Sequence, residues 1–187
     1  MKPLPWKTLS SRDVLRDRWI RLRADRCEVA PGQIIESYYV MEEPEWVHVV
    51  ALDPELRVLL VRQYRHAISS FSWELPGGGA DDGEDLLTTA QRELIEETGA
   101  TGDGWQHLGG YVTNPGRHNN RVQGFLARNI RLVQPPKLDE NEVLESAFFT
   151  IPEVLELIRT CEFSSAMHVA LFYRAMQEIG VMRFEVK

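Results

Sequence analysis

The chain has 187 residues, a formal net charge of −7 and 43% hydrophobic residues. This length suits one domain with a substantial core plus a small additional lobe. No segment is strongly enriched in Lys and Arg, so we expect no nucleic-acid partner. No apolar run approaches the roughly 18 residues of a membrane span, so we expect no membrane partner either. The two cysteines, Cys27 and Cys161, fit neither a zinc site nor a disulfide framework, and we therefore expect a cytoplasmic protein.

The N-terminal part of the chain predicts a β-hairpin extension over residues 1–44. Two strand-like runs, at residues 19–29 and 33–41, are separated by Pro31-Gly32. A two-stranded ribbon with this many apolar side chains is marginal by itself in water. We therefore expect the hairpin to hold together a homodimer.

The rest of the chain, residues 45–187, predicts one domain that mixes strands with helices. Residues 101–104 are expected to form a loop, and Ser164 is expected to be the N-cap of the last helix. The predicted elements are strands at residues 46–52, 57–64, 106–113, 121–131 and 146–150, and helices at 85–98, 152–160 and 164–179.

The first predicted helix carries an unusual cluster of acidic residues. Glu93, Glu96 and Glu97 are three and four residues apart, which places their carboxylates on one helix face. Like charges at these spacings repel, so the face is either solvated or binds a cation. A glycine turn at residues 77–79 precedes the helix and lets backbone carbonyls approach an ion closely, which favours cation binding.

This stretch fits the pattern Gly-x5-Glu-x7-Arg-Glu-U-x-Glu-Glu-x-Gly-U, where U is a bulky aliphatic residue. The residues at its specified positions are Gly78, Glu84, Arg92, Glu93, Leu94, Glu96, Glu97, Gly99 and Ala100. The stretch resembles the signature of the Nudix hydrolases, and only Ala100 departs from it, because it is small. The resemblance implies a Nudix-type α/β/α sandwich with a mixed central sheet, to which the N-terminal β-hairpin extension is added.

The resemblance also implies an Mg²⁺-dependent pyrophosphatase, in which Mn²⁺ may substitute. Hard divalent cations held by carboxylates can neutralise two phosphoryl groups and activate a water. By the resemblance, Glu93 and Glu97 are metal ligands with Glu96 beside them, and the Gly77 carbonyl completes the shell. Arg92 braces the glutamates, and Glu84 orients Arg92 or the loop.

Two further features resemble the ADP-ribose pyrophosphatase branch of the family. Pro115 lies fifteen residues after Ala100, where the branch often has a proline. The acidic run from Asp139 resembles a loop whose glutamate takes a proton from the attacking water. We assign that role to Glu140, with Glu142 as its helper or as an outer metal ligand.

Residues outside the signature are expected to select the substrate, a small-molecule nucleotide. Arg65, Arg117 and His118 could hold the diphosphate, although Arg65 could equally be a surface charge. Tyr38 or Trp46 could stack on the base, or each could simply pack in the core.

Two departures weaken the assignment to ADP-ribose itself. Asn119-Asn120 stands where the branch has a glutamate, and no arginine adjoins Tyr38-Tyr39. The predicted substrate is ADP-ribose or a nucleotide sugar. The alternatives are an inactive Nudix-like sensor of a nucleotide sugar and a Nudix enzyme that acts on a dinucleotide or a coenzyme.

Overall fold

A computed structural model describes residues 4–140 and 142–183, and the chain divides into two compact units. One unit contains the chain up to Pro44 together with Val112–Arg121. The other contains Glu45–Tyr111 and the chain from Val122 onward. The loop at Val112–Arg121 therefore belongs with the N-terminal unit, although it lies far from that unit along the chain.

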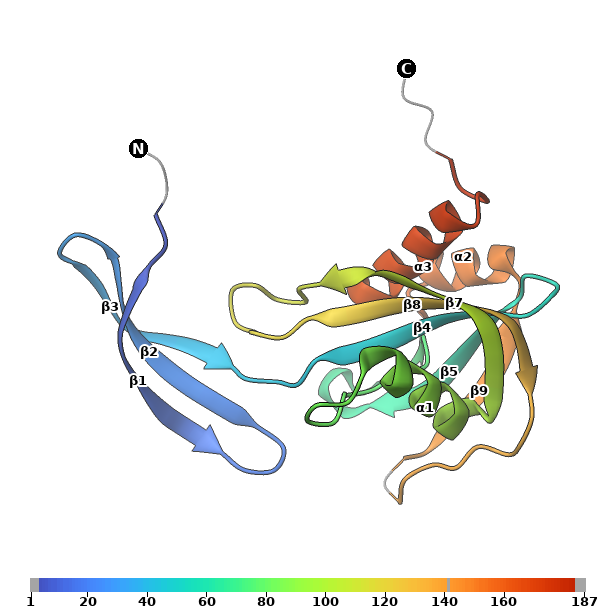
Figure 1. Ribbon diagram of the computed structural model, residues 1–187, viewed down its shortest axis with the longest axis horizontal. Coiled ribbons are helices and arrows are strands. Elements are labelled where there is room, and N and C mark those ends of the chain that lie inside the picture. Colours follow the sequence, from blue (N-terminus) through green and yellow to red (C-terminus); the bar gives the residue numbers. More distant parts are fainter. Residues whose placement is uncertain (1–3, 141, 184–187) are drawn as a thin grey trace. The chain divides into compact units, whose positions relative to one another are not determined.

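The N-terminal unit is an antiparallel sheet of three strands in the order β1-β2-β3 (Figure 1). Its strands are β1 (Lys7–Arg16), β2 (Arg21–Ala30) and β3 (Gln33–Met41). The predicted hairpin corresponds to β2 and β3. Strand β1 escaped prediction because it is exposed along its whole length and therefore shows no alternation of polar and apolar residues.

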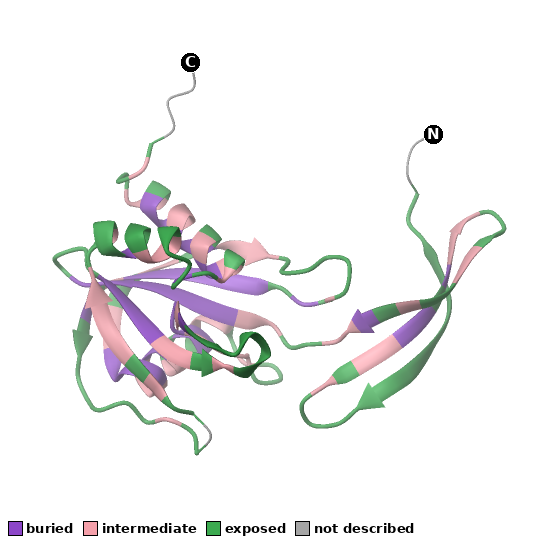
Figure 2. Cartoon of the chain, turned by 180° about the vertical axis from the view of Figure 1, so that it is seen from behind, coloured by how far each residue is buried: buried purple, intermediate pink, exposed green. Residues whose placement is uncertain are grey.

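The larger unit is built on a mixed sheet in the order β6-β5-β4-β8-β7, with β9 paired to β5. The pair β4–β8 is parallel, and the other neighbours are antiparallel. The strands are β4 (Trp46–Leu52), β5 (Val58–Arg65), β6 (Ser70–Glu74), β7 (Ala100–Tyr111), β8 (Val122–Leu132) and β9 (Leu144–Phe149). Figure 2 shows that the central strands β4 and β8 are largely buried.

Three α-helices cover the two faces of this sheet (Figure 1), which is the α/β/α sandwich expected from the sequence. Helix α1 lies on one face, where its buried side chains pack with Val47, Val49 and Ala51 of β4. Helices α2 and α3 lie on the other face and share a core with Val50 and Leu52. This split follows from the two-residue period of a strand. The helices are α1 (Leu86–Thr98), α2 (Ile151–Arg159) and α3 (Ala166–Glu178), and a 3-10 turn spans His66–Ile68.

Two local predictions are wrong. Residues 101–104 belong to β7 and form no loop: two glycines suggested a break, but the strand absorbs them through irregular pairing between Thr101 and Gln106. Helix α3 begins after Ser165, not Ser164, and the Ser165 side chain makes no capping hydrogen bond. Strand β6 was not predicted as a strand, since its five residues continue directly into the glycine turn.

Strands β4 and β5 pair only where Ala51 and Leu52 meet Leu59 and Val58. Beyond that point they diverge, and the glycine turn lies alongside β4 in place of a neighbouring strand. The amides of Val49 and Val47 donate to the carbonyls of Pro76 and Gly78, each over 2.9 Å. The diverging sheet therefore fixes the turn next to α1.

Candidate active site

Helix α1 presents its glutamates toward the glycine turn, at the border of its buried face, where Glu97 is itself buried. Asp85 caps the helix by accepting a 3.0 Å hydrogen bond from the Thr88 amide, and Gly99 ends it in a left-handed conformation. Leu94, which is fully buried, anchors the helix on the sheet. The geometry of one helix turn then places Glu93 and Glu97 together beside the glycine turn.

Arg92 holds the acidic cluster together. Its Nη1 donates to Glu93 and Glu96 over 2.7 and 3.1 Å, and its Nη2 donates to Glu84 over 3.0 Å. The hydrogen bonds from Arg92 lower the pKa of Glu84 to about 2. Because Glu84 also accepts from the Asp81 amide, it ties Arg92 to the loop in front of the helix.

The glycine turn reaches the same cluster from the sheet side. The Gly77 amide donates a 2.8 Å hydrogen bond to Oε2 of Glu97. A Cβ atom on Gly77 would stand 2.0 Å from the Val47 carbonyl oxygen, and one on Gly78 would stand 2.6 Å from the Glu93 carboxylate. Gly77 therefore requires glycine, because it meets the backbone of β4, whereas a side chain at Gly78 would displace the Glu93 carboxylate.

Burial makes Glu97 the most strongly perturbed carboxylate in this group. Its residue is 5% exposed, and burial, with Glu93 and Glu142 adding to it, raises its pKa to about 8. Burial also raises the pKa of Glu93, against the opposing effect of Arg92. Two adjacent carboxylates with raised pKa values are short of positive charge.

This donor set fits a hard divalent cation. Carboxylate oxygens are the ligands such ions prefer, and a cation would supply the charge that Glu93 and Glu97 lack. Successive carbonyls of an extended segment alternate in direction, so the Gly77 carbonyl turns away from β4 while its neighbours bond to that strand. Within residues 4–140 and 142–183, no three acidic, His or Cys side chains already form a metal cage. Arg92 instead draws Glu93 and Glu96 toward itself.

Arg65, at the end of β5, is held by an acidic partner that the sequence did not reveal. Its Nε and Nη2 donate to the two carboxylate oxygens of Glu74 over 2.8 and 2.5 Å. Glu74 is 5% exposed, and its hydrogen bonds raise the pKa of Arg65. The charges of Glu97 and Glu142 also act on Arg65. The two residues lie on the paired strands β5 and β6 but four positions apart in the register, since Arg65 is opposite Ser70, so only the three-dimensional structure shows that they meet.

The two glutamates of the acidic loop, Glu140 and Glu142, are both exposed, but only Glu142 makes a described hydrogen bond within the loop. Glu142 folds back on the loop, where its Oε2 accepts a 3.3 Å hydrogen bond from the Asp139 amide. Its charge helps to raise the pKa of both Glu93 and Glu97. Glu140 is exposed to solvent. Asn141, between them, lies outside the described residues.

The predicted base- and phosphate-contacting residues fall in both units. In the N-terminal unit, the Tyr38 hydroxyl donates a 2.7 Å hydrogen bond to the Gly116 carbonyl, between Pro115 and Arg117. His118 in the same loop lies 3.3 Å from Glu43. Trp46 belongs to the larger unit, where it packs against the core beneath α3.

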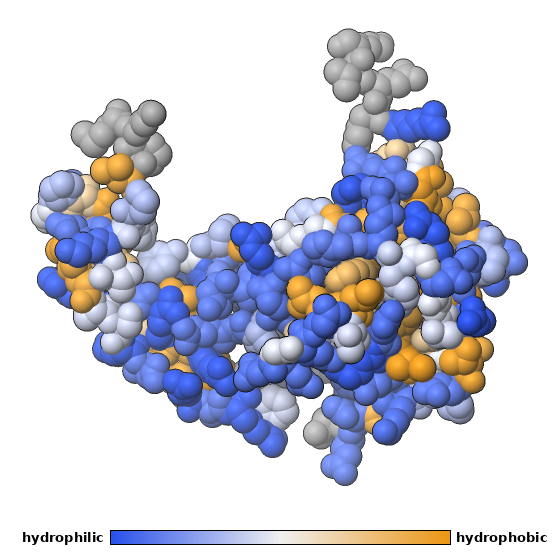
Figure 3. Space-filling model, in the orientation of Figure 1, coloured by the Kyte–Doolittle hydropathy of each residue, from blue (hydrophilic) through white to orange (hydrophobic). Residues whose placement is uncertain are grey.

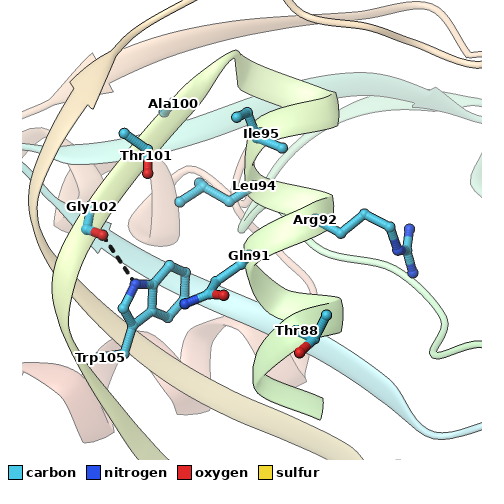
Figure 4. A pocket seen from close by; sticks show the side chains of 9 residues that line it. All are labelled: Thr88, Gln91, Arg92, Leu94, Ile95, Ala100, Thr101, Gly102 and Trp105. Carbon is cyan, nitrogen blue, oxygen red and sulfur yellow. Dashed lines mark hydrogen bonds between the residues drawn. The ribbon is translucent and has the colours of Figure 1, made fainter. Parts of the chain in front are cut away.

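A separate pocket of about 410 Å³ lies between α1 and the start of β7 (Figure 4). The Arg92 side chain extends away from it, whereas Gln91 and Trp105 face each other across it. Its lining residues are Thr88, Gln91, Arg92, Leu94, Ile95, Ala100, Thr101, Gly102 and Trp105. Because this lining contains no carboxylate, the pocket is not where a metal would meet a pyrophosphate.

Sequence reasoning also missed a buried pair of histidines behind the glycine turn. His48 of β4 and His168 of α3 approach to 3.1 Å between their Nε2 atoms. They are 120 residues apart, and neither belongs to a motif, so no sequence signal joins them.

The comparisons with known proteins agree with this geometry. The profile of the NUDIX domain matches residues 44–167, and the chain belongs to this family. Residues 6–41 match a second profile, the nucleoside diphosphate sugar hydrolase N-terminal domain. The chain is thus a Nudix hydrolase, and Nudix hydrolases generally use a divalent metal.

Two curated relatives resemble the chain over nearly its whole length. The methanol dehydrogenase activator of Bacillus methanolicus is 29% identical over 92% of this chain and 94% of its own. The ADP-ribose pyrophosphatase of Bacillus subtilis is 28% identical over 95% of this chain and 97% of its own. A crystal structure titled as an ADP compounds hydrolase shares the fold, with a TM-score of 0.85, 21% identity and 97% coverage of both chains.

The raised pKa of Glu97 predicts that its contribution to the stability of the metal-free protein is lost as the pH rises. The folded state binds this proton more tightly than the unfolded state, so the contribution is complete below pH 4.5 and is lost as the pH approaches 8. At about 1.4 kcal/mol per pH unit, this contribution should fall by up to about 3 kcal/mol between pH 5 and pH 8. The lowered pKa values of His48 and His168 act in the opposite direction below about pH 6.5, so the Glu97 contribution is the difference between the wild type and Glu97→Gln. Urea denaturation in EDTA measures this change.

Glu97→Gln should remove most of this dependence, since glutamine does not titrate. Glu84 contributes little in this window, because its lowered pKa places its effect below pH 5. A Glu97→Gln profile parallel to that of the wild type between pH 5 and pH 8 would show that Glu97 does not titrate in this window.

Proposed function

We propose that the protein hydrolyses the pyrophosphate bond of a nucleoside diphosphate derivative, with ADP-ribose or a nucleotide sugar as the substrate. The products would be a nucleoside monophosphate and a sugar phosphate. The observation that carries this proposal is the hydrogen bond from the Gly77 amide to buried Glu97, which joins the glycine turn to the acidic helix. The resemblance to the ADP-ribose pyrophosphatase of Bacillus subtilis supports the choice of ADP-ribose.

Mg²⁺ is the proposed metal, and Mn²⁺ is expected to substitute for it. Glu93, Glu97 and the Gly77 carbonyl would hold it, with Glu96 beside them. When bound, such a cation neutralises phosphoryl charge and lowers the pKa of a water. Arg92 keeps the glutamates within reach by its ion pairs, each of which leaves part of the carboxylate free.

Glu142 is the better candidate for the general base. It belongs to a loop near the acidic helix, and its charge raises the pKa of Glu93 and Glu97, which supports a position close to the attacking water. Glu140 remains the alternative, because it is an exposed glutamate two residues from Glu142 in the same acidic loop.

Arg65 is proposed to hold the diphosphate. Glu74 orients its guanidinium through two hydrogen bonds, and 43% of the Arg65 side chain stays exposed for a ligand. Arg117 and His118, with Pro115 shaping their loop, are proposed to contact the rest of the nucleotide. Tyr38 and Trp46 remain proposals for the base.

A substrate panel tests the activity. With Mg²⁺, the protein should hydrolyse ADP-ribose or a nucleotide sugar faster than dinucleotides and coenzymes, and EDTA should abolish turnover. Glu97→Gln should reduce kcat by at least about 100-fold without unfolding the protein, because a metal ligand is lost. Phosphatase-coupled release of phosphate measures the rates.

Glu55→Gln is a matched control, since Glu55 is an exposed glutamate in the turn before β5. It should behave like the wild type. A protein that binds the nucleotides but turns over none of them would instead be a sensor. Preference for a dinucleotide would favour a Nudix enzyme that acts on dinucleotides or coenzymes.

The general base is tested by paired substitutions. Glu142→Gln should lower kcat by about 10²–10⁴-fold, the usual contribution of general-base catalysis, while KM changes little. Glu140→Gln should leave kcat within a few-fold of the wild type. The reverse result would exchange the two assignments.

The N-terminal unit is proposed to form a homodimer. Strand β1 is an edge strand exposed throughout, and this unit exposes the apolar side chains of Trp6, Leu15 and Trp19. Figure 3 shows hydrophobic (orange) patches on the surface of this unit. An exposed edge with apolar side chains favours pairing with another chain. Cys27 and Cys161 are both free, which is consistent with the proposed cytoplasmic location. No helix of the described residues is long and apolar enough to cross a membrane.

Sedimentation equilibrium tests the dimer. The protein should sediment as a dimer at about 10 µM, and Leu15→Lys should shift it toward the monomer by placing a charge on the edge strand. A monomeric wild type at this concentration would contradict the proposal.

A further inference from the structure

The pair His48–His168 is buried directly behind the glycine turn. The two residues are 7% and 4% exposed, and their rings lie 4.2 Å apart between centroids. His168 also receives a 3.3 Å hydrogen bond at Nδ1 from the amide of Leu75, the residue that precedes the turn. Helix α3 is thus connected through two imidazoles and one peptide group to the loop that meets Glu97.

These contacts fix the tautomers of both rings. Burial lowers the pKa of His168 and of His48, so both rings are neutral. Nδ1 of His168 accepts from the Leu75 amide, and the proton of His168 must therefore reside on Nε2. That proton is donated to Nε2 of His48, which leaves the proton of His48 on Nδ1. The N–H groups of Leu75, His168 and His48 consequently all point in the same direction along this series, from Leu75 to His48.

Nδ1 of His48, the last atom in this series of hydrogen bonds, lies against the glycine turn. A Cβ atom on Gly77 would stand 2.7 Å from Nδ1 of His48. Nδ1 is buried and has no well-aligned hydrogen-bond partner in the described part of the chain, although the Leu75 backbone also interacts with the ring. The imidazole thus fills the space behind Gly77, and a displaced ring would displace the turn.

The backbone of the same strand, β4, also holds the turn by fixed contacts. Val47 and Val49, which flank His48 in β4, donate to the carbonyls of Gly78 and Pro76. Loss of the acceptor on His168 would leave the Leu75 amide buried and unpaired, and such a group moves toward a new partner at the expense of its neighbours. The Gly77 amide, two residues later, would move with it.

We propose that the His48–His168 pair is a positioning device for metal binding, which sets the backbone from Leu75 to Gly77 and, through the Gly77 amide, the carboxylate of Glu97. The role of the pair in catalysis rests on the proposed function, but its effect on metal affinity does not. Neither histidine touches the substrate or the metal.

Three substitutions of His168 separate the two hydrogen bonds. Asparagine places an acceptor near the position of Nδ1 and can keep the Leu75 amide paired, whereas glutamine places its amide near Nε2 and leucine offers neither group. The probe is Mn²⁺ alone, titrated without substrate and followed by the electron paramagnetic resonance signal of the free ion.

His168→Leu and His168→Gln should weaken Mn²⁺ binding by about 10–100-fold, as is usual when the partners behind a metal site are lost. His168→Asn should stay within about 3-fold of the wild type. Met176→Ala is the matched control, because it opens the same buried side of α3 away from the turn. It should lower Tm but leave the Mn²⁺ affinity unchanged.

Equal Mn²⁺ affinity in all variants would overturn the proposal, and so would an Asn variant no better than the Leu variant. A loss of affinity in Met176→Ala as large as in His168→Leu would mean that general destabilisation is responsible. If the wild type binds Mn²⁺ and the His168 series behaves as expected, yet no nucleotide is hydrolysed, the proposed function fails while the positioning role stands.

Discussion

The rest of the site depends on one constraint, the burial of the Glu97 carboxylate against the Gly77 amide. A carboxylate in this position loses its water and must be compensated by hydrogen bonds or positive charge. One backbone donor, 2.8 Å away, compensates it only in part, so its pKa stays high. The residual deficit of positive charge is what makes the cluster suited to a cation. A Glu97 carboxylate that was fully compensated by hydrogen bonds would be more stable but less suited to binding a cation.

The sheet provides the space for this arrangement. Because β4 and β5 pair at only two positions, the glycine turn can take the place of a strand beside β4. On the other edge of β5, Arg65 and Glu74 meet across the β5–β6 pair, and the Glu97 charge acts on Arg65. The proposed metal-binding residues and the proposed diphosphate contact are therefore both placed by the strands that flank this opening.

The two units contribute differently to function. The larger unit contains the acidic helix, the glycine turn and Arg65. The N-terminal unit has a small core with a polar centre, in which buried Asp25 accepts hydrogen bonds from Ser11 and Arg23. Its loop carries Arg117 and His118, proposed to recognise substrate. Chemistry and selectivity are thus assigned to different parts of the chain.

The sequence by itself determined the acidic helix and the strand β4, because these depend on local spacing and on hydrophobic period. It also identified the family, since the nine signature residues lie within 23 positions. It did not determine β1, whose polar residues carry no period, or the strand character of residues 101–104, where pairing with β8 overrides two glycines. Only the tertiary structure joined Arg65 to Glu74 and His48 to His168. Such pairs depend on strand register and on helix packing across the sheet, and spacing along the chain carries no record of either.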